Sequence, residues 1–87
     1  MDTHEQLIHK VRARRALPNP AVRRMIRERT GLSQGDIALP LGVSRAAISH
    51  WERGEREPRG ARLDAYLALL ERLQQEIFIV DHSGRTT

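Results

Sequence analysis

The stretch from Gln34 to Arg53 constrains the fold more than any other part of the 87-residue chain. Ile37 and Leu41 stand four residues apart, so one face of a short helix would carry both. Ile48 and Trp51 stand three residues apart and mark the apolar face of a second helix. The pattern therefore predicts two short amphipathic helices with only a few residues between them.

The residues between these helices predict a tight turn. Gly42 can adopt the positive φ that ends a helix, which a residue with a Cβ adopts only at a cost. Ser44 is a good N-cap for the second helix, because its hydroxyl can accept a hydrogen bond from a free backbone N–H. Ala38 is small where the two helices must cross closely. Two helices joined in this way form a helix-turn-helix, which places its second helix in the major groove of DNA.

An ordered set of motifs surrounds this turn. It comprises Gly31-Leu32-Ser33-Gln34, Leu41-Gly42-Val43-Ser44, Ile48-Ser49-His50-Trp51-Glu52-Arg53-Gly54 and Pro58. As a set, these motifs resemble the Cro/repressor (XRE) family of helix-turn-helix proteins, over the chain from Pro20 to Leu70. The resemblance implies an all-α, lambda-repressor-like domain of about five helices that binds double-stranded DNA.

Capping signals place the helices that precede the motif. Asn19 and Pro20 are preferred at the cap and the first position of a helix, which would run to Thr30. Pro18 would end an extra helix at the N-terminus. Pro40 removes one backbone hydrogen bond from the helix before the turn, so we expect that helix to be short, bent or tightened in its last turn.

Basic residues are concentrated near the N-terminus. Between Lys10 and Arg29 the sequence has eight basic residues against one acid, although the formal charge of the whole chain is only +4. Such an asymmetry favours a polyanionic partner. Residues 1–17 form a separate basic segment, which is either a helix packed on the domain or an arm ordered on DNA. In the second case Arg14 and Arg15 would contact the DNA backbone.

The C-terminal part of the chain predicts a long helix that begins near Gly60. Its apolar residues alternate in steps of three and four, which is a heptad pattern. They are Leu63, Tyr66, Leu70, Leu73, Ile77 and Val80. Residues 73–81 have little domain surface left to cover, so we expect them to form an oligomerisation segment. Residues 77–80 are either the end of this helix or a short strand that pairs across a dimer.

These boundaries divide the chain into four parts. A DNA-binding domain covers residues 18–72, between the basic segment and the oligomerisation segment, and a disordered tail covers residues 82–87. An exposed apolar patch on the oligomerisation segment indicates a partner surface, which a second copy of the chain would cover. The residues expected at this dimer interface are Leu70, Leu73, Ile77, Phe78 and Val80.

Base contacts are expected from the outward face of the second motif helix, opposite Ile48 and Trp51. The resemblance implies the same positions for base contacts, namely Arg45, Ala46, Ser49 and His50. Arginine can pair with O6 and N7 of guanine, and an alanine methyl can contact the methyl group of thymine. Ser49 can donate or accept, so it specifies little. His50 could bond to a guanine or a phosphate, with a charge that depends on pH.

Contacts to the DNA backbone are expected around the same helix. Gln34 opens the first motif helix, where free N–H groups and the helix dipole favour a phosphate, and the family glutamine contacts the backbone. The other candidates are Ser44, Arg53, Arg56 and Arg59. The resemblance also implies a structural ion pair between Arg27 and Glu52, whose loss would lower stability without changing base preference.

Other classes of function find little support in the sequence. The chain has no cysteine, which excludes a disulfide and a thiolate metal site. His4 and His9 stand five residues apart, a poor spacing for a helical pair of metal ligands, and no glycine-rich phosphate loop occurs. We therefore expect no enzyme activity, no metal and no cofactor. No apolar run is long enough to span a membrane, so we expect a cytoplasmic protein. The family resemblance implies a bacterial or phage origin.

The sequence thus predicts a transcriptional regulator, specifically a repressor that binds an inverted repeat as a homodimer through residues 45–53. Two half-sites about one helical turn (roughly 34 Å) apart would give the dimer a specificity that a single motif lacks. The alternative is an antitoxin-type protein whose apolar segment at residues 73–80 binds a different protein. A stable homodimer on an inverted repeat favours the first interpretation, and capture of a different protein favours the second.

Overall fold

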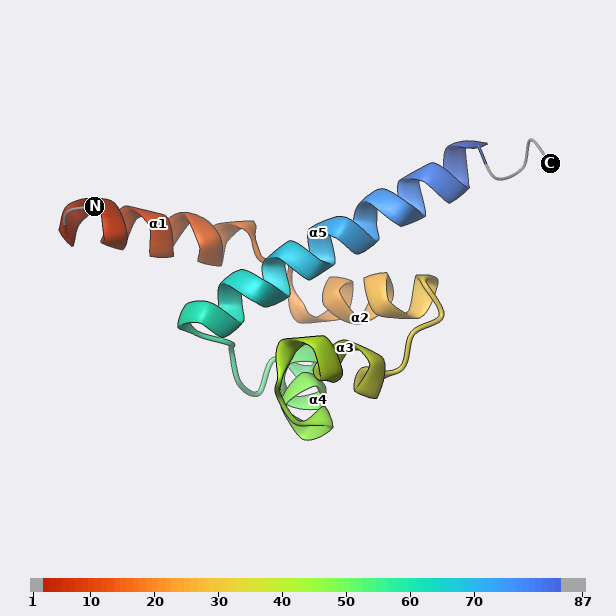
Figure 1. The fold of residues 1–87 in the computed structure, drawn as a ribbon, viewed down its shortest axis with the longest axis horizontal. Coiled ribbons are helices and arrows are strands. Elements are labelled where there is room, and N and C mark those ends of the chain that lie inside the picture. The colour runs from red at the N-terminus through yellow and green to blue at the C-terminus, as the bar shows by residue number, and fades with distance from the viewer. Residues whose placement is uncertain (1–2, 84–87) are drawn as a thin grey trace.

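The computed structural model describes residues 3–83, which form helices and contain no strand (Figure 1). In chain order the helices are α1 (Thr3–Ala16), α2 (Pro20–Arg29), α3 (Gln34–Leu41), α4 (Arg45–Arg53) and α5 (Gly60–Ser83). The all-α prediction is confirmed, and so are the predicted caps of α2, α3 and α4. None of the described helices is long and apolar enough to cross a membrane.

The core lies where α2, α3 and α4 meet the middle of α5. Its largest fully buried side chains come from all four helices and are Tyr66, Ile26, Ile37, Ile48 and Leu70. The rings of Trp51 and Tyr66 stack at an angle of 44°, with their centroids 4.9 Å apart. Burial of side chains of this size contributes about 1.5–3 kcal/mol each, so this small cluster supplies most of the force that holds α4 in place.

The helix α3 is short, as expected from Pro40. It has eight residues, and Pro40 lies inside its last turn. The N–H of Gly42 donates to the carbonyl oxygens of Ala38 and Leu39, four and three residues back, the second over 3.2 Å. The bond to Leu39 is the tighter 3₁₀ pattern, which also ends α2 and α4, so this tightening is not specific to the proline.

The C-terminal helix corrects three predictions. It is continuous through residues 77–80, so the strand alternative is wrong. His82 and Ser83 are helical, so a tail from residue 82 is also wrong, and residues 84–87 lie outside the described part. Leu70 is only 1% exposed and belongs to the core of its own chain, which leaves it no surface for a dimer interface. The heptad pattern continues from the core into the exposed part of the helix without a break. Spacing alone therefore does not separate residues of the core from residues of a dimer interface.

The helix α1 packs on α5 with its polar side. His9 Nε2 lies 3.7 Å from the carboxylate of Asp64, and both side chains are more than half exposed. The apolar residues of α1 point elsewhere and remain about half exposed; they are Leu7, Ile8 and Val11. In Figure 1, α1 and the last turns of α5 extend in opposite directions from the core. The fold therefore leaves apolar side chains uncovered on α1.

Candidate nucleic-acid interface

Local hydrogen bonds fix the two motif helices and the turn between them. The N–H of Asp36 donates to Ser33 Oγ (3.0 Å), and the N–H of Ser33 donates to the Asp36 carboxylate (2.8 Å). These bonds hold the pKa of Asp36 below its usual value. The backbone N–H of Ser33 has the larger effect, and the hydroxyl of Ser33 has the smaller one. Gly42 ends α3 with a φ of 66°, and the N–H of Ala47 donates to Ser44 Oγ (3.1 Å) at the start of α4. The orientation of α4 is thus set within a dozen residues.

The helix α4 turns one face to the core and the other to solvent. Ile48 and Trp51 are 0% and 5% exposed. The four positions expected to contact bases lie outside the core. Arg45 and Ala46 are exposed, and Ser49 and His50 are half-buried. The side chains in the first turn of α4 are therefore open to a partner.

A polar network covers the second half of this outward face and is centred on Glu55. Its carboxylate accepts hydrogen bonds from Arg53 Nε (2.9 Å), Arg53 Nη2 (3.0 Å) and His50 Nδ1 (2.8 Å). Arg53 also donates to Ser49 Oγ. The hydrogen bonds from Arg53, and then from His50, lower the pKa of Glu55 to about 2. A full negative charge therefore lies beside three residues expected at DNA.

Glu55 is a site residue that the sequence pattern did not indicate. Gly54 ends α4 with a φ of 72°, and the N–H of Glu55 donates to the carbonyl oxygen of His50 (3.0 Å). This cap turns the chain back over the last turn of the helix. The sequence does contain a signal for this site, which is an acidic residue directly after a glycine that ends a helix. The glycine cap turns the chain back, so the acidic side chain lies beside the side chains of the last helical turn.

Arg27 of α2 and Glu52 of α4 form a two-pronged ion pair. Arg27 Nε and Nη2 lie 2.6 and 3.0 Å from the two carboxylate oxygens, and the side chains are 13% and 2% exposed. Arg27 Nη1 also donates to the carbonyl oxygen of Leu32 (2.8 Å). The pKa of Arg27 is raised above its usual value, chiefly by the hydrogen bond to Glu52. Gln34, expected at the DNA backbone, donates its amide to the same carboxylate (3.1 Å).

Arg23 is a buried cation that the sequence pattern did not separate from the surface arginines. Its side chain is 4% exposed. Nε donates to the carbonyl oxygen of Pro18 (2.6 Å), and Nη1 donates to that of Trp51 (2.9 Å). Nη2 and Nη1 also bond to the carboxylate of Glu57, at 2.7 and 3.1 Å. One guanidinium thus joins the α1–α2 linker, the end of α4 and the loop before α5.

The basic run between Lys10 and Arg29 therefore does not form one surface. Arg23 and Arg27 are held inside the domain by the contacts just described. Arg24 pairs with Glu28 one turn along its own helix, at 3.0 Å. A run of arginines in sequence points around a helix in all directions, so a basic segment of sequence does not by itself form a basic surface.

The expected backbone contacts Arg14 and Arg15 lie on α1, and their side chains are outside the described part of the structure. Figure 1 shows α1 on the other side of α5 from α4. The structure therefore does not bring this segment together with the outward face of α4.

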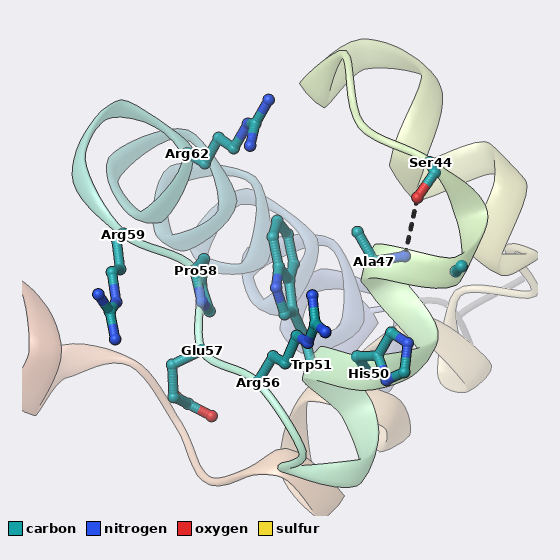
Figure 2. Close-up of a pocket in the computed structure, with 10 residues that line it drawn as sticks. Ser44, Ala47, His50, Trp51, Arg56, Glu57, Pro58, Arg59 and Arg62 are labelled. Carbon is teal, nitrogen blue, oxygen red and sulfur yellow. Dashed lines mark hydrogen bonds between the residues drawn. The ribbon is translucent and has the colours of Figure 1, made fainter.

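A hollow of about 430 Å³ lies between α4 and the start of α5 (Figure 2). In Figure 2 the indole of Trp51 stands between the two helices, with Pro58 beside it. Three arginines line the hollow, namely Arg56, Arg59 and Arg62. The first two were expected at the DNA backbone, and Arg62 adds a third cation from the first turn of α5. Three cations around one concave surface favour an anionic partner.

Fold and site together define the class of protein: an all-α, lambda-repressor-like domain whose motif presents a polar helix face to solvent. The family model described as helix-turn-helix matches residues 24–72, more than half of the chain. The protein belongs to this family, the Cro/repressor (XRE) type of DNA-binding transcription regulators, which are typically not enzymes. No curated protein and no solved structure matches the chain.

Proposed function

We propose that the protein represses transcription in the cytoplasm by binding an inverted repeat in duplex DNA as a homodimer. The observation that carries this proposal is the orientation of α4. Ile48 and Trp51 are buried, while Arg45 and Ala46 remain exposed in the first turn. A motif helix held in this way offers its N-terminal side chains to base edges in the major groove.

The proposed backbone contacts lie beside these base contacts. Ser44 caps α4, and it lines the same hollow as Arg56 and Arg59. Arg53 reaches a phosphate by exchanging its bonds with the Glu55 carboxylate. Guanidinium groups placed along a duplex release counterions, so affinity should fall steeply with salt. Arg14 and Arg15 are left out of these contacts, because α1 lies across α5 from α4.

The proposed dimer rests on the apolar residues that the fold leaves uncovered. Leu73 and Ile77 are only half-buried against the core, where α5 leaves the other helices behind (Figure 1). Phe78 and Val80 follow in the sequence, but their side chains lie outside the described part of the structure. The half-exposed apolar residues of α1 form a second set, on the helix that extends in the opposite direction from the core. A second copy of the chain would bury both sets.

Selection from a random duplex library tests the DNA proposal. We expect the full chain to enrich an inverted repeat, and Arg45→Ala to relax the preference at one base pair of each half-site. A good arginine–guanine pair gives about 1–3 kcal/mol of discrimination, so the relaxation should be five-fold or more. Arg24→Ala is the matched control, because Arg24 is exposed and pairs only along its own helix with Glu28. Equal losses of affinity on every sequence would show that Arg45 contacts phosphate only.

Sedimentation equilibrium tests the dimer. Ile77→Ser should weaken self-association, whereas Leu39→Ser should not, because Leu39 is 83% exposed on α3, away from this surface. Circular dichroism on both variants checks that the fold is retained. A chain that stays monomeric on its operator would refute the homodimer, and stable capture of a different protein by the same residues would favour the antitoxin-type alternative.

A further inference from the structure

The Glu55 network fixes which ring nitrogen of His50 carries a hydrogen. The carboxylate is ionised, because the hydrogen bonds from Arg53 and His50 lower the pKa of Glu55 to about 2. An ionised carboxylate has no hydrogen to donate, so the 2.8 Å bond requires the hydrogen on His50 Nδ1. A neutral imidazole carries one such hydrogen, so its Nε2 is left as an acceptor.

The other charged groups around His50 do not compete for this arrangement. The hollow that His50 lines holds three arginines, which can only donate: Arg56, Arg59 and Arg62. It also holds one acid, Glu57, whose two oxygens are bonded by Arg23 at 2.7 and 3.1 Å. Arg53 is bonded to Glu55 itself. Glu55 is thus the carboxylate that sets the tautomer of His50.

We propose that Glu55 is a specificity-determining residue that acts through His50. Neutral His50, with its hydrogen held on Nδ1, accepts a hydrogen bond at Nε2 from the exocyclic amino group of cytosine or adenine. In the major groove these amino groups are donors, whereas O6 and N7 of guanine and O4 of thymine are acceptors. The inference rests on the proposed DNA-binding function, and it replaces the guanine or phosphate expected opposite His50 with an amino-bearing base.

Glu55 has a second effect that can be measured separately. Its carboxylate holds Arg53 through two hydrogen bonds, so it competes with phosphate for that guanidinium. Removing the charge of Glu55 should therefore raise affinity for every sequence and steepen the salt dependence by about one phosphate contact. The loss of preference concerns one base pair, whereas the gain of affinity is the same for every sequence, so comparing several sequences separates the two effects.

Nuclear magnetic resonance of the free protein tests the tautomer without DNA. In full-length protein labelled with ¹⁵N at histidine, at pH 8, the ring nitrogens of His50 should show the Nδ1–H form. A His50→Gln variant assigns the signal among the four histidines of the chain. Glu55→Ala, which removes the acceptor, should shift the signal toward the Nε2–H form, which predominates in free imidazole side chains. An Nε2–H form in the wild type would overturn the inference.

Library selection at pH 8 tests the base preference. The wild type should enrich one base pair at a position of each half-site, and His50→Ala should abolish that preference. Every base pair carries one amino group in the major groove, so an analogue of its adenine or cytosine that lacks this group should lower the affinity of the wild type about ten-fold, but not that of Glu55→Ala. Glu71→Ala, which removes a charge from an exposed residue of α5, should keep the wild-type response. A wild type indifferent to the loss of the amino group, or a Glu55→Ala variant that keeps the wild-type response, would overturn the inference and leave the proposed function intact. If the wild type enriched no sequence, the proposed function itself would fail.

Discussion

Replacing Arg27 with methionine isolates the ion pair that joins α2 to α4. The methionine keeps much of the aliphatic volume of the arginine but removes the two bonds to Glu52 and the bond to the carbonyl of Leu32. Glu52 is then left 2% exposed, with the Gln34 amide as its remaining donor at 3.1 Å. The variant therefore measures the cost of a buried carboxylate without its cation.

The size of this cost follows from the burial of the two groups. Loss of one partner from a buried pair costs about 3–5 kcal/mol. Gln34 compensates part of the Glu52 charge, and Arg27 is 13% exposed, so water can reach the vacated side. We therefore expect the lower end, about 3 kcal/mol in the free energy of unfolding. For a domain of this size that corresponds to a fall in Tm of roughly 12–24 °C.

Urea unfolding followed by tryptophan fluorescence measures this change directly, because the chain has one tryptophan and Trp51 is buried in the core. The double variant Arg27→Met with Glu52→Leu should recover most of the loss, since no charge is then left buried. Base preference should be unchanged, because neither residue lies on the outward face of α4. A loss below about 1 kcal/mol, or a double variant no more stable than the single one, would refute the reasoning.

Three further predictions concern pH and the helix caps. The lowered pKa of Glu55 means that its ionised form stabilises the fold: the contribution is complete above pH 4.5 and disappears as the pH falls toward 2. The unfolding free energies of wild type and Glu55→Gln should therefore converge in acid, and a constant difference would contradict this. Burial raises the pKa of Tyr66 to about 12, so its neutral form stabilises the fold below pH 10 and this contribution is lost as the pH rises toward 12. The phenolate absorbance should titrate near pH 12 in the native protein, and a midpoint near that of the urea-unfolded chain would contradict burial. Gly54→Ala should destabilise more than Gly42→Ala, because both place a side chain at positive φ, at a cost of about 1–2 kcal/mol, but only at Gly54 does a Cβ come within 3.0 Å of Pro20; equal Tm values would refute the contact.

The parts of the fold that could be predicted from sequence depend on short-range signals. Gly42 donates its N–H to carbonyl oxygens three and four residues earlier, and Ser44 accepts from an N–H three residues later. The turn and the start of α4 therefore follow from the order of residues alone. The inward direction of Ile48 and Trp51 follows from helical spacing. The pairing of Arg27 with Glu52 joins two helices, so only the family resemblance indicated it.

The remaining features depend on contacts between distant residues. Arg23 takes two of its acceptors from positions 28 and 34 residues further along the chain, and the sequence around it does not distinguish it from its neighbour Arg24. The heptad spacing of Leu70 is the same whether the residue belongs to a core or to a dimer interface. Leu70 is in the core because α2 packs against α5. The apolar residues of α1 predict a buried face, but the observed packing on α5 uses the opposite side, which contains His9. The order of residues in α1 does not reveal this choice.

The contacts of Arg23 have a consequence for communication across the molecule. The same guanidinium holds the carbonyl of Pro18, directly after α1, and the carboxylate of Glu57, beside Arg56 in the loop that borders the hollow. A partner that pulls the linker away removes one acceptor from a buried charge, at a cost of about 1.5–3 kcal/mol. Because energetic coupling is reciprocal, a duplex that immobilises the loop also favours the linker in its present position. With the proposed duplex contacts of the loop, we therefore expect binding at the N-terminal helix and affinity for a duplex to be linked, although α1 and α4 lie on opposite sides of α5.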